Sequence, residues 1–169
     1  MLTAVFALLV GIDLSGNSIH LAGSKPAVLV FVRTDCPISN RYAPELNRLY
    51  REYSNRVDFY LVYADASETT DSIRKHISEY GYQFHPLRDP GHALARRAKA
   101  SVTPEAALFS PSGELLYHGR IDDRYVDFGK SLPEPTRHDL EEALQLTLAG
   151  KPVKVTSTRA IGCFLADVQ

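Results

Sequence analysis

The sequence has few cysteines, almost no net charge and no hydrophobic segment long enough to span a bilayer. Only two cysteines occur in 169 residues, which excludes a disulfide-scaffolded mini-protein and a cysteine-rich zinc site. The formal net charge of −1 argues against a surface for nucleic acid or anionic membranes. We therefore expect no nucleic-acid partner and no integral membrane segment.

The signature motifs of several enzyme classes are also missing. The sequence contains no glycine-rich phosphate loop, no His-Glu-x-x-His and no Gly-x-Ser-x-Gly. We expect no cofactor. The composition, 44% hydrophobic and 23% charged, is that of an ordinary globular protein, and the length suits one domain with a proper core.

The most informative segment runs from Pro26 to Tyr53. It begins with an apolar run rich in β-branched residues, Ala27 to Val32, which predicts a strand buried on both faces. Pro37 suits the first position of a helix, so Cys36 falls at the helix N-cap. Free backbone N–H groups and the helix dipole favour a thiolate there. The apolar stripe of that helix consists of Leu46, Leu49, Tyr50 and Tyr53.

The residues around Cys36 decide between two interpretations of this cysteine. A free cysteine is usually a small buried hydrophobe. Here Asp35 and Pro37 flank it, and Arg33 and Arg41 lie nearby in the sequence. We therefore expect the thiol to reach solvent and to act as a nucleophile.

The rest of the chain alternates between strand and helix patterns, which predicts a central sheet with parallel strands. The expected elements are a strand at 18–21 in an N-terminal hairpin, a strand at 57–64, a helix capped by Thr70 or Asp71 and ended by Gly81, a strand at 84–87, a helix starting at Asp89-Pro90, a hairpin at 106–119 and a helix capped by Thr136.

Four segments depart from this regular pattern. Residues 2–10 are apolar and predict a strand or an arm that packs on the domain, with the remnant of a removed leader as the alternative. Pro44 should kink the first helix, because it removes one backbone hydrogen bond. Residues 120–135 predict a long loop. We expect a domain over residues 1–150, followed by a tail over 151–169 that contains Cys163.

Three features together resemble the thioredoxin-fold redoxins, which include extracytoplasmic thiol-disulfide oxidoreductases and peroxiredoxin-like proteins. They are the buried strand, the Cys36-Pro37-Ile38-Ser39 helix start and the later Val102-Thr103-Pro104. The resemblance covers Gly16 to Gly150. It implies an α/β thioredoxin-like fold, with a central mixed β-sheet, helices on both faces, an N-terminal hairpin and a C-terminal tail. It also implies exchange with protein thiols and disulfides in a periplasmic or extracytoplasmic compartment, a cytoplasmic one remaining open.

The resemblance assigns roles to single residues. Cys36 matches the attacking cysteine, and Ser39 stands where thioredoxins carry the second one. A hydroxyl can hydrogen-bond a thiolate but cannot resolve a mixed disulfide. Thr103-Pro104 matches the cis-proline position, whose backbone binds a substrate chain. Asp35 replaces the usual tryptophan, and its charge should leave Cys36 a less perturbed thiol.

With Ser39 unable to resolve, Cys163 is the one possible intramolecular partner of Cys36. Apolar neighbours can anchor its tail (Ile161, Phe164 and Leu165), and Gly162 lets the backbone approach closely. Some peroxiredoxin-like relatives resolve through a C-terminal cysteine. We expect Cys163 near Cys36, as resolving thiol or second soft ligand, and a bond between them would stabilise the fold by about 4–5 kcal/mol. The alternative is a half-exposed thiol on a loose tail.

Two other functions remain open. A thiol peroxidase of the peroxiredoxin type needs Pro-x-x-x-Thr/Ser-x-x-Cys, but Leu29 and Arg33 occupy the first two of these positions. Arg120 could supply the arginine that such sites place near the thiolate. A non-enzymatic copper-binding or interaction module of the same fold could use both cysteines and His118. The acidic residues after Arg120 match no calcium loop, and we expect no metal there.

Overall fold

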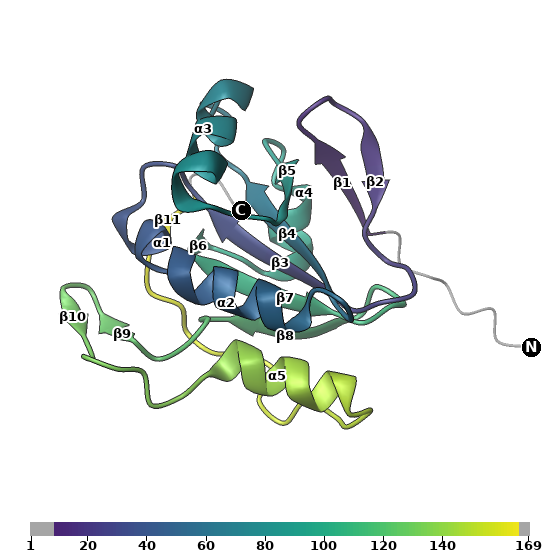
Figure 1. Ribbon diagram of the computed structural model, residues 1–169, viewed down its shortest axis with the longest axis vertical. Coiled ribbons are helices and arrows are strands. Elements are labelled where there is room, and N and C mark those ends of the chain that lie inside the picture. The colour runs from purple at the N-terminus through teal and green to yellow at the C-terminus, as the bar shows by residue number, and fades with distance from the viewer. Residues whose placement is uncertain (1–8, 166–169) are drawn as a thin grey trace, which may run out of the picture.

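A seven-stranded mixed sheet forms the centre of the computed structural model, which describes residues 9–165 (Figure 1). In spatial order its strands are β2 (Ser18–His20), β1 (Val10–Asp13), β5 (His85–Arg88), β4 (Asp58–Tyr63), β3 (Ala27–Val32), β7 (Glu105–Phe109) and β8 (Leu115–Gly119). The three central strands β5, β4 and β3 are parallel, and the strands outside them pair antiparallel. The predicted mixed α/β sheet and its N-terminal hairpin are confirmed.

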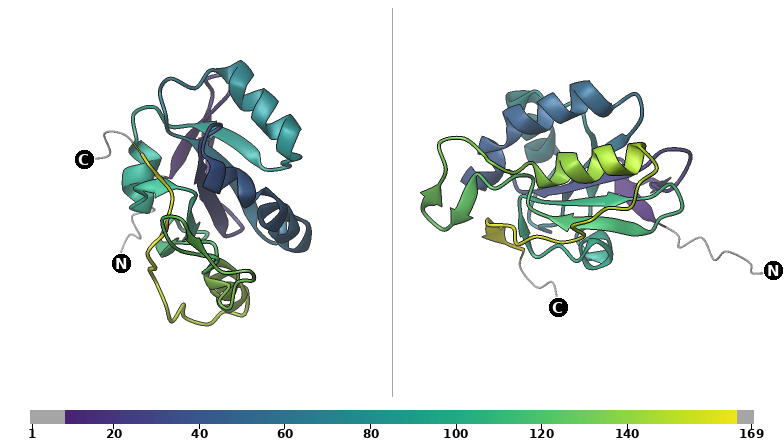
Figure 2. Two further views of the ribbon diagram at one scale, coloured as in Figure 1. Left: turned by 90° about the vertical axis from the view of Figure 1, so that its left-hand side faces the viewer. Right: turned by 90° about the horizontal axis from the view of Figure 1, so that it is seen from below.

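Helices cover both faces of this sheet (Figure 2). They are α1 (Pro37–Arg41), α2 (Ala43–Tyr53), α3 (Thr70–Tyr80), α4 (Ala93–Ala98) and α5 (Asp139–Leu148). Buried residues of α2, α3 and α5 share one core cluster, and those of α4 belong to the other. The crossovers between the parallel strands β3, β4 and β5 contain α1, α2 and α3, since neighbouring parallel strands need a long connection.

Strand β3 shows why its sequence is apolar without alternation. All six of its residues are buried. Val28, Val30 and Val32 lie in the core with α2 and α5, whereas Ala27, Leu29 and Phe31 lie in the core with α4. Successive side chains of a strand point to opposite faces, so a strand with a core on each side needs apolar residues throughout.

The helix after β3 is divided in two. α1 ends at Arg41, Tyr42 separates it from α2, and Pro44 lies in the first turn of α2. Proline has no N–H to donate back to residue 40, and it is tolerated in a first turn because those N–H groups have no helical partner. The predicted kink at Pro44 is therefore a helix break two residues earlier.

Two predicted helix starts are wrong by a few residues. Thr69, not Thr70 or Asp71, caps α3 and accepts a hydrogen bond from Ser72 N–H at 3.1 Å. The helix expected from Asp89-Pro90 begins at Ala93. Asp89 still satisfies its first turn, because its carboxylate accepts the N–H groups of Leu94 and Ala95 at 3.1 and 2.8 Å.

The segment 120–135 and the start of the last helix also differ from expectation. The predicted long loop contains a small hairpin, β9 (Tyr125–Asp127) and β10 (Lys130–Ser131). Thr136 does not cap the last helix, which begins at Asp139. The N–H and hydroxyl of Thr136 donate instead to the Asp123 carboxylate, which joins the loop to the segment just before α5.

The tail after α5 runs back along the domain to the end of the sheet that carries α1 (Figures 1 and 2). Thr156 and Thr158 exchange backbone hydrogen bonds with His118 of β8. Further on, β11 (Cys163–Phe164) pairs antiparallel with β6 (Val102–Thr103). The tail is therefore attached at two separate places.

At the N-terminus, the segment predicted as strand or arm lies mostly outside the described residues. Of residues 2–10, Leu9 is buried, and its carbonyl accepts the N–H of Leu21 at 2.8 Å; Val10 begins β1. In the described part of the chain, every helix is too short or too polar to cross a membrane.

Candidate active site

The two cysteines, separated by most of the chain, lie side by side. Cys36 is the N-cap of α1, as predicted, and Cys163 lies on β11 opposite Thr103 of β6. Their Sγ atoms are 2.7 Å apart, and both thiols are free. A disulfide requires about 2.05 Å between the sulfurs, so oxidation of the two thiols would need only a small movement to form the bond.

The sequence predicted that the Cys36 thiol reaches solvent, and this prediction is wrong. Only 1% of the residue is exposed, because the tail that carries Cys163 lies over it. Its Sγ is also 3.2 Å from the Thr103 carbonyl oxygen, which can accept a hydrogen bond from the protonated thiol. The charged neighbours that suggested exposure point elsewhere: Asp35 pairs with Arg33 at 3.2 Å.

The environment shifts the pKa values of the two thiols in opposite directions. Burial alone would raise the pKa of Cys36, but hydrogen bonds with Cys163, Ser39 and Thr103 outweigh it, and the pKa lies below that of an ordinary thiol. Burial and the adjacent Cys36 raise the pKa of Cys163 to about 11. That Asp35 makes Cys36 a less perturbed thiol stays a prediction; the Asp35 carboxylate is paired with Arg33. Cys36 is therefore the better thiolate, with Cys163 as a proton-bearing neighbour.

Three other predicted site residues lie around Cys36. Ser39 is completely buried in the first turn of α1, and among the described residues its hydroxyl has no hydrogen-bond partner. Thr103 is buried beside the sulfur, and its hydroxyl donates to the Cys163 carbonyl at 3.5 Å. The Thr103–Pro104 peptide bond is cis, the isomer expected from the sequence. Helix α1 and strand β6 thus bring these residues to one place.

Arg120 has different neighbours from those expected. Its guanidinium binds the buried Asp139 carboxylate at 2.7 Å, and its backbone N–H donates to the Thr158 hydroxyl at 3.0 Å. This ion pair raises the pKa of Arg120. None of its described polar contacts is with Cys36. Arg120 therefore joins α5 to the tail and does not contact the Cys36 sulfur.

The candidate metal ligands are likewise engaged elsewhere. His118 faces the buried Glu105, with 3.7 Å between Nδ1 and the carboxylate. Asp122 accepts a hydrogen bond from the Tyr42 hydroxyl at 2.6 Å. Asp123 accepts hydrogen bonds from the N–H groups of Thr136 and Arg137. These hydrogen bonds lower the pKa of Asp123 to about 2, against the effect of burial.

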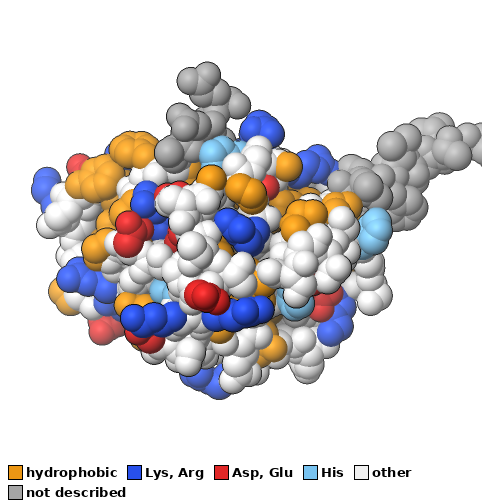
Figure 3. Space-filling view, turned by 90° about the horizontal axis from the view of Figure 1, so that it is seen from above, with side chains coloured by type: hydrophobic (Ala, Val, Ile, Leu, Met, Phe, Trp, Pro, Cys, Tyr) orange, Lys and Arg blue, Asp and Glu red, His pale blue; other side chains and the backbone are white. Residues whose placement is uncertain are grey.

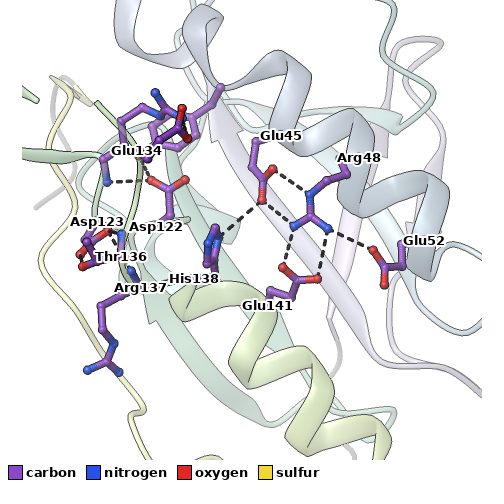
Figure 4. Close-up of polar contacts among 12 residues, drawn as sticks. Glu45, Arg48, Glu52, Asp122, Asp123, Glu134, Thr136, Arg137, His138 and Glu141 are labelled. Carbon is purple, nitrogen blue, oxygen red and sulfur yellow. Dashed lines mark hydrogen bonds and ion pairs between the residues drawn. The ribbon is translucent and has the colours of Figure 1, made fainter. Parts of the chain in front are cut away.

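A cluster between α2 and α5 could in principle bind a cation. Ligand atoms of Glu45, His138 and Glu141 lie within 4.8 Å of one another. The Arg48 guanidinium, however, binds Glu45 at 2.7 Å and Glu141 at 2.6 Å (Figure 4). The chain's own cation therefore occupies this position, and the network joins the two helices on one face of the sheet.

Sequence reasoning missed the residues that hold the segment before Cys36. The buried Glu68 accepts the Thr34 N–H at 2.7 Å, and Asn40 donates to the Thr34 carbonyl at 3.1 Å. Asn40 in turn contacts the buried His76, whose other ring nitrogen contacts Tyr63. Burial raises the pKa of Glu68 and lowers that of His76.

One signal pointed to Glu68. It lies in the loop after β4, beside the loop after β3, because the carboxyl ends of adjacent parallel strands meet at one edge of a sheet. Glu68 thereby places a buried carboxylate against the backbone two residues before Cys36.

Comparisons with known proteins identify the family and agree with the fold. The sequence profile of the AhpC/TSA family matches residues 7–118. The match includes Cys36, Thr103 and Pro104 and ends before the tail with Cys163.

The chain is similar to three proteins in particular. Thiol-disulfide oxidoreductase ResA of Halalkalibacterium halodurans is 28% identical over 128 residues, 73% of this chain and 72% of the relative. A hypothetical protein of Sinorhizobium meliloti has a crystal structure with a TM-score of 0.78 and 28% identity, covering 94% of this chain and 90% of that one. A secreted disulfide oxidoreductase of Mycobacterium tuberculosis shares the fold, with a TM-score of 0.57, 20% identity and coverage of 88% and 99%.

Proposed function

The chain belongs to the AhpC/TSA family, and from this we propose that it performs thiol–disulfide exchange, with Cys36 as attacking thiolate and Cys163 as resolving thiol. The observation that carries the proposal is the 2.7 Å separation of the two sulfurs. The opposite pKa shifts of the pair support it, because the attacking sulfur must ionise before the resolving one.

The reaction divides into two exchanges. The Cys36 thiolate attacks one sulfur of a partner's disulfide, forms a mixed disulfide and releases the partner's other sulfur as a thiolate. Cys163 then loses its proton and attacks Cys36 Sγ, which releases the partner's first sulfur. The partner's disulfide gains two electrons, and the chain ends with a Cys36–Cys163 disulfide. The same steps in reverse oxidise a partner dithiol.

The neighbouring residues would act on binding and ionisation. We propose that Thr103 and Pro104 bind the partner polypeptide through their backbone, because they lie against the Cys36 sulfur. The buried Ser39 hydroxyl would hydrogen-bond the thiolate. Residues 1–150 and the tail would form one functional unit, since the second thiol comes from the tail. We place the chain outside the cytoplasm, where disulfides persist, in keeping with the secreted protein of the same fold.

The test uses the reduced full-length chain and a disulfide-bonded peptide as oxidant. We expect Cys36→Ser to abolish exchange, and Cys163→Ser to accumulate a mixed disulfide on Cys36, seen by mass spectrometry. Unchanged turnover in Cys36→Ser would end the proposal. Consumption of hydrogen peroxide faster than of the peptide disulfide would favour the peroxidase alternative, and tight copper binding without exchange would favour the metal-carrying one.

A further inference from the structure

The end of the tail binds the domain partly through its backbone. β11 pairs with β6 through backbone hydrogen bonds, with Cys163 opposite Thr103 and Phe164 opposite Val102. Leu165 N–H continues the pairing to the Ser101 carbonyl at 2.9 Å. In the described chain β11 is the single strand partner of β6. A strand edge of this kind can accept any extended chain.

Gly162 makes the close approach possible. A Cβ at this position would overlap the Thr103 carbonyl and contact the Pro104 nitrogen. The residue before Cys163 therefore cannot carry a side chain while the cysteine lies opposite Thr103. The same limit applies to another polypeptide placed there in the same register.

The docked tail blocks access to the nucleophile. With Cys36 1% exposed, a partner's disulfide cannot reach its sulfur until the tail moves. Ile161 and Leu165 are buried, whereas Phe164 is 71% exposed, so two side chains hold this end. The attachment at Thr158, whose backbone lies against Gly119, is separate. The end of the tail can therefore leave β6 while residues 156–158 keep it nearby.

We propose that residues 161–165 are an internal competitor of the partner polypeptide at the edge of β6. This rests on the proposed function. In the reduced protein the tail occupies the partner's place, and it leaves before Cys36 attacks the partner's disulfide. When it returns, Cys163 attacks the mixed disulfide, the Cys36–Cys163 bond forms, and the partner leaves as a thiolate from the edge that the tail takes back. The partner that fits is an extended segment with glycine immediately before its cysteine.

The experiment compares Gly162→Ala with Gly23→Ala, a glycine with open space around it. In the reduced full-length chain we expect iodoacetamide to alkylate Cys36 of Gly162→Ala at least about tenfold faster than Cys36 of the wild type. An added methyl group in a packed contact lowers the equilibrium constant for docking of the tail by about that factor. Gly23→Ala should match the wild type. Thermal unfolding of both variants shows whether the domain remains folded.

The second measurement uses two synthetic peptides with the sequence of residues 159–165, each carrying a small thiol bound to its cysteine as a disulfide. One keeps glycine before the cysteine, and the other has valine there. We expect faster exchange of Cys36 with the glycine peptide, and a mixed disulfide that persists longer in Gly162→Ala than in the wild type.

Equal alkylation rates in Gly162→Ala and the wild type, or equal exchange rates with both peptides, would overturn the proposal that residues 161–165 compete with the partner. Fast alkylation of Cys36 with no exchange in any variant would instead overturn the proposed function and leave the covering role of the tail intact.

Discussion

The two cysteines arrive at the same place from very different parts of the fold. Cys36 follows a six-residue strand that is paired on both sides and buried on both faces, and it begins a helix. Cys163 lies on a two-residue strand with one neighbour, at the end of a tail attached at two points. The core therefore fixes the position of Cys36, whereas few contacts hold Cys163.

The largest expected effect comes from breaking the core on the Cys36 side. Phe31→Ala removes a fully buried side chain of β3 and should lower the free energy of unfolding by about 3–5 kcal/mol. Ile161→Ala, on the tail, should lower it by less than about 1 kcal/mol, because the tail can open while the domain stays folded. Urea unfolding of both variants measures the difference.

Cysteine alkylation completes that comparison. Ile161→Ala should expose Cys36 to iodoacetamide, and Phe164→Ala, whose ring is mostly exposed, serves as the control and should not. Equal losses of unfolding free energy in the Phe31 and Ile161 variants would show that the tail is an integral part of the core.

A smaller effect concerns the ionisation of Cys36. Cys163 contributes a hydrogen bond that lowers the pKa of Cys36, so Cys163→Ala should move its thiolate titration to higher pH, and Cys163→Ser, which keeps a donor, should move it less. A lowered thiol pKa stabilises the fold above the unfolded value of about 8.5, and this gain is lost as the pH falls through the folded pKa. Ultraviolet absorbance of the thiolate follows the titration. A Cys163→Ala titration identical to that of the wild type would remove Cys163 as the cause.

The smallest effect is expected at Glu68, which holds the segment before Cys36. Burial raises its pKa above the usual value of a glutamate, so the folded state keeps its proton longer than the unfolded state as the pH rises. Stability should therefore fall as the pH passes from the unfolded to the folded pKa. Glu68→Gln retains an acceptor for Thr34 N–H and should reduce this decline, by about 1 kcal/mol at most. Urea unfolding across that pH range tests it, and an unchanged slope would contradict it.

The fold could be predicted because its signals are local. The apolar run at 27–32, Pro37 after Cys36 and the alternation of strand and helix patterns each follow from the needs of a few neighbouring residues. The errors lie where distant groups intervene. Asp89 and Thr136 were expected to begin helices, but Asp89 reaches past its neighbours to Leu94 and Ala95, and Thr136 binds Asp123. Sequence spacing cannot show such contacts.

The candidate site divides along the same line. The placement of Cys36 at a helix N-cap follows from the sequence, because a buried strand followed by proline leaves few alternatives, and the absence of any other thiol indicates Cys163 as the possible partner. Three further features depend on contacts between distant segments: the tail lies over Cys36, Glu68 and Asn40 hold Thr34, and Arg120 binds Asp139. These contacts join residues far apart in the chain, and their geometry depends on how the strands and loops pack in space, which no short stretch of sequence encodes.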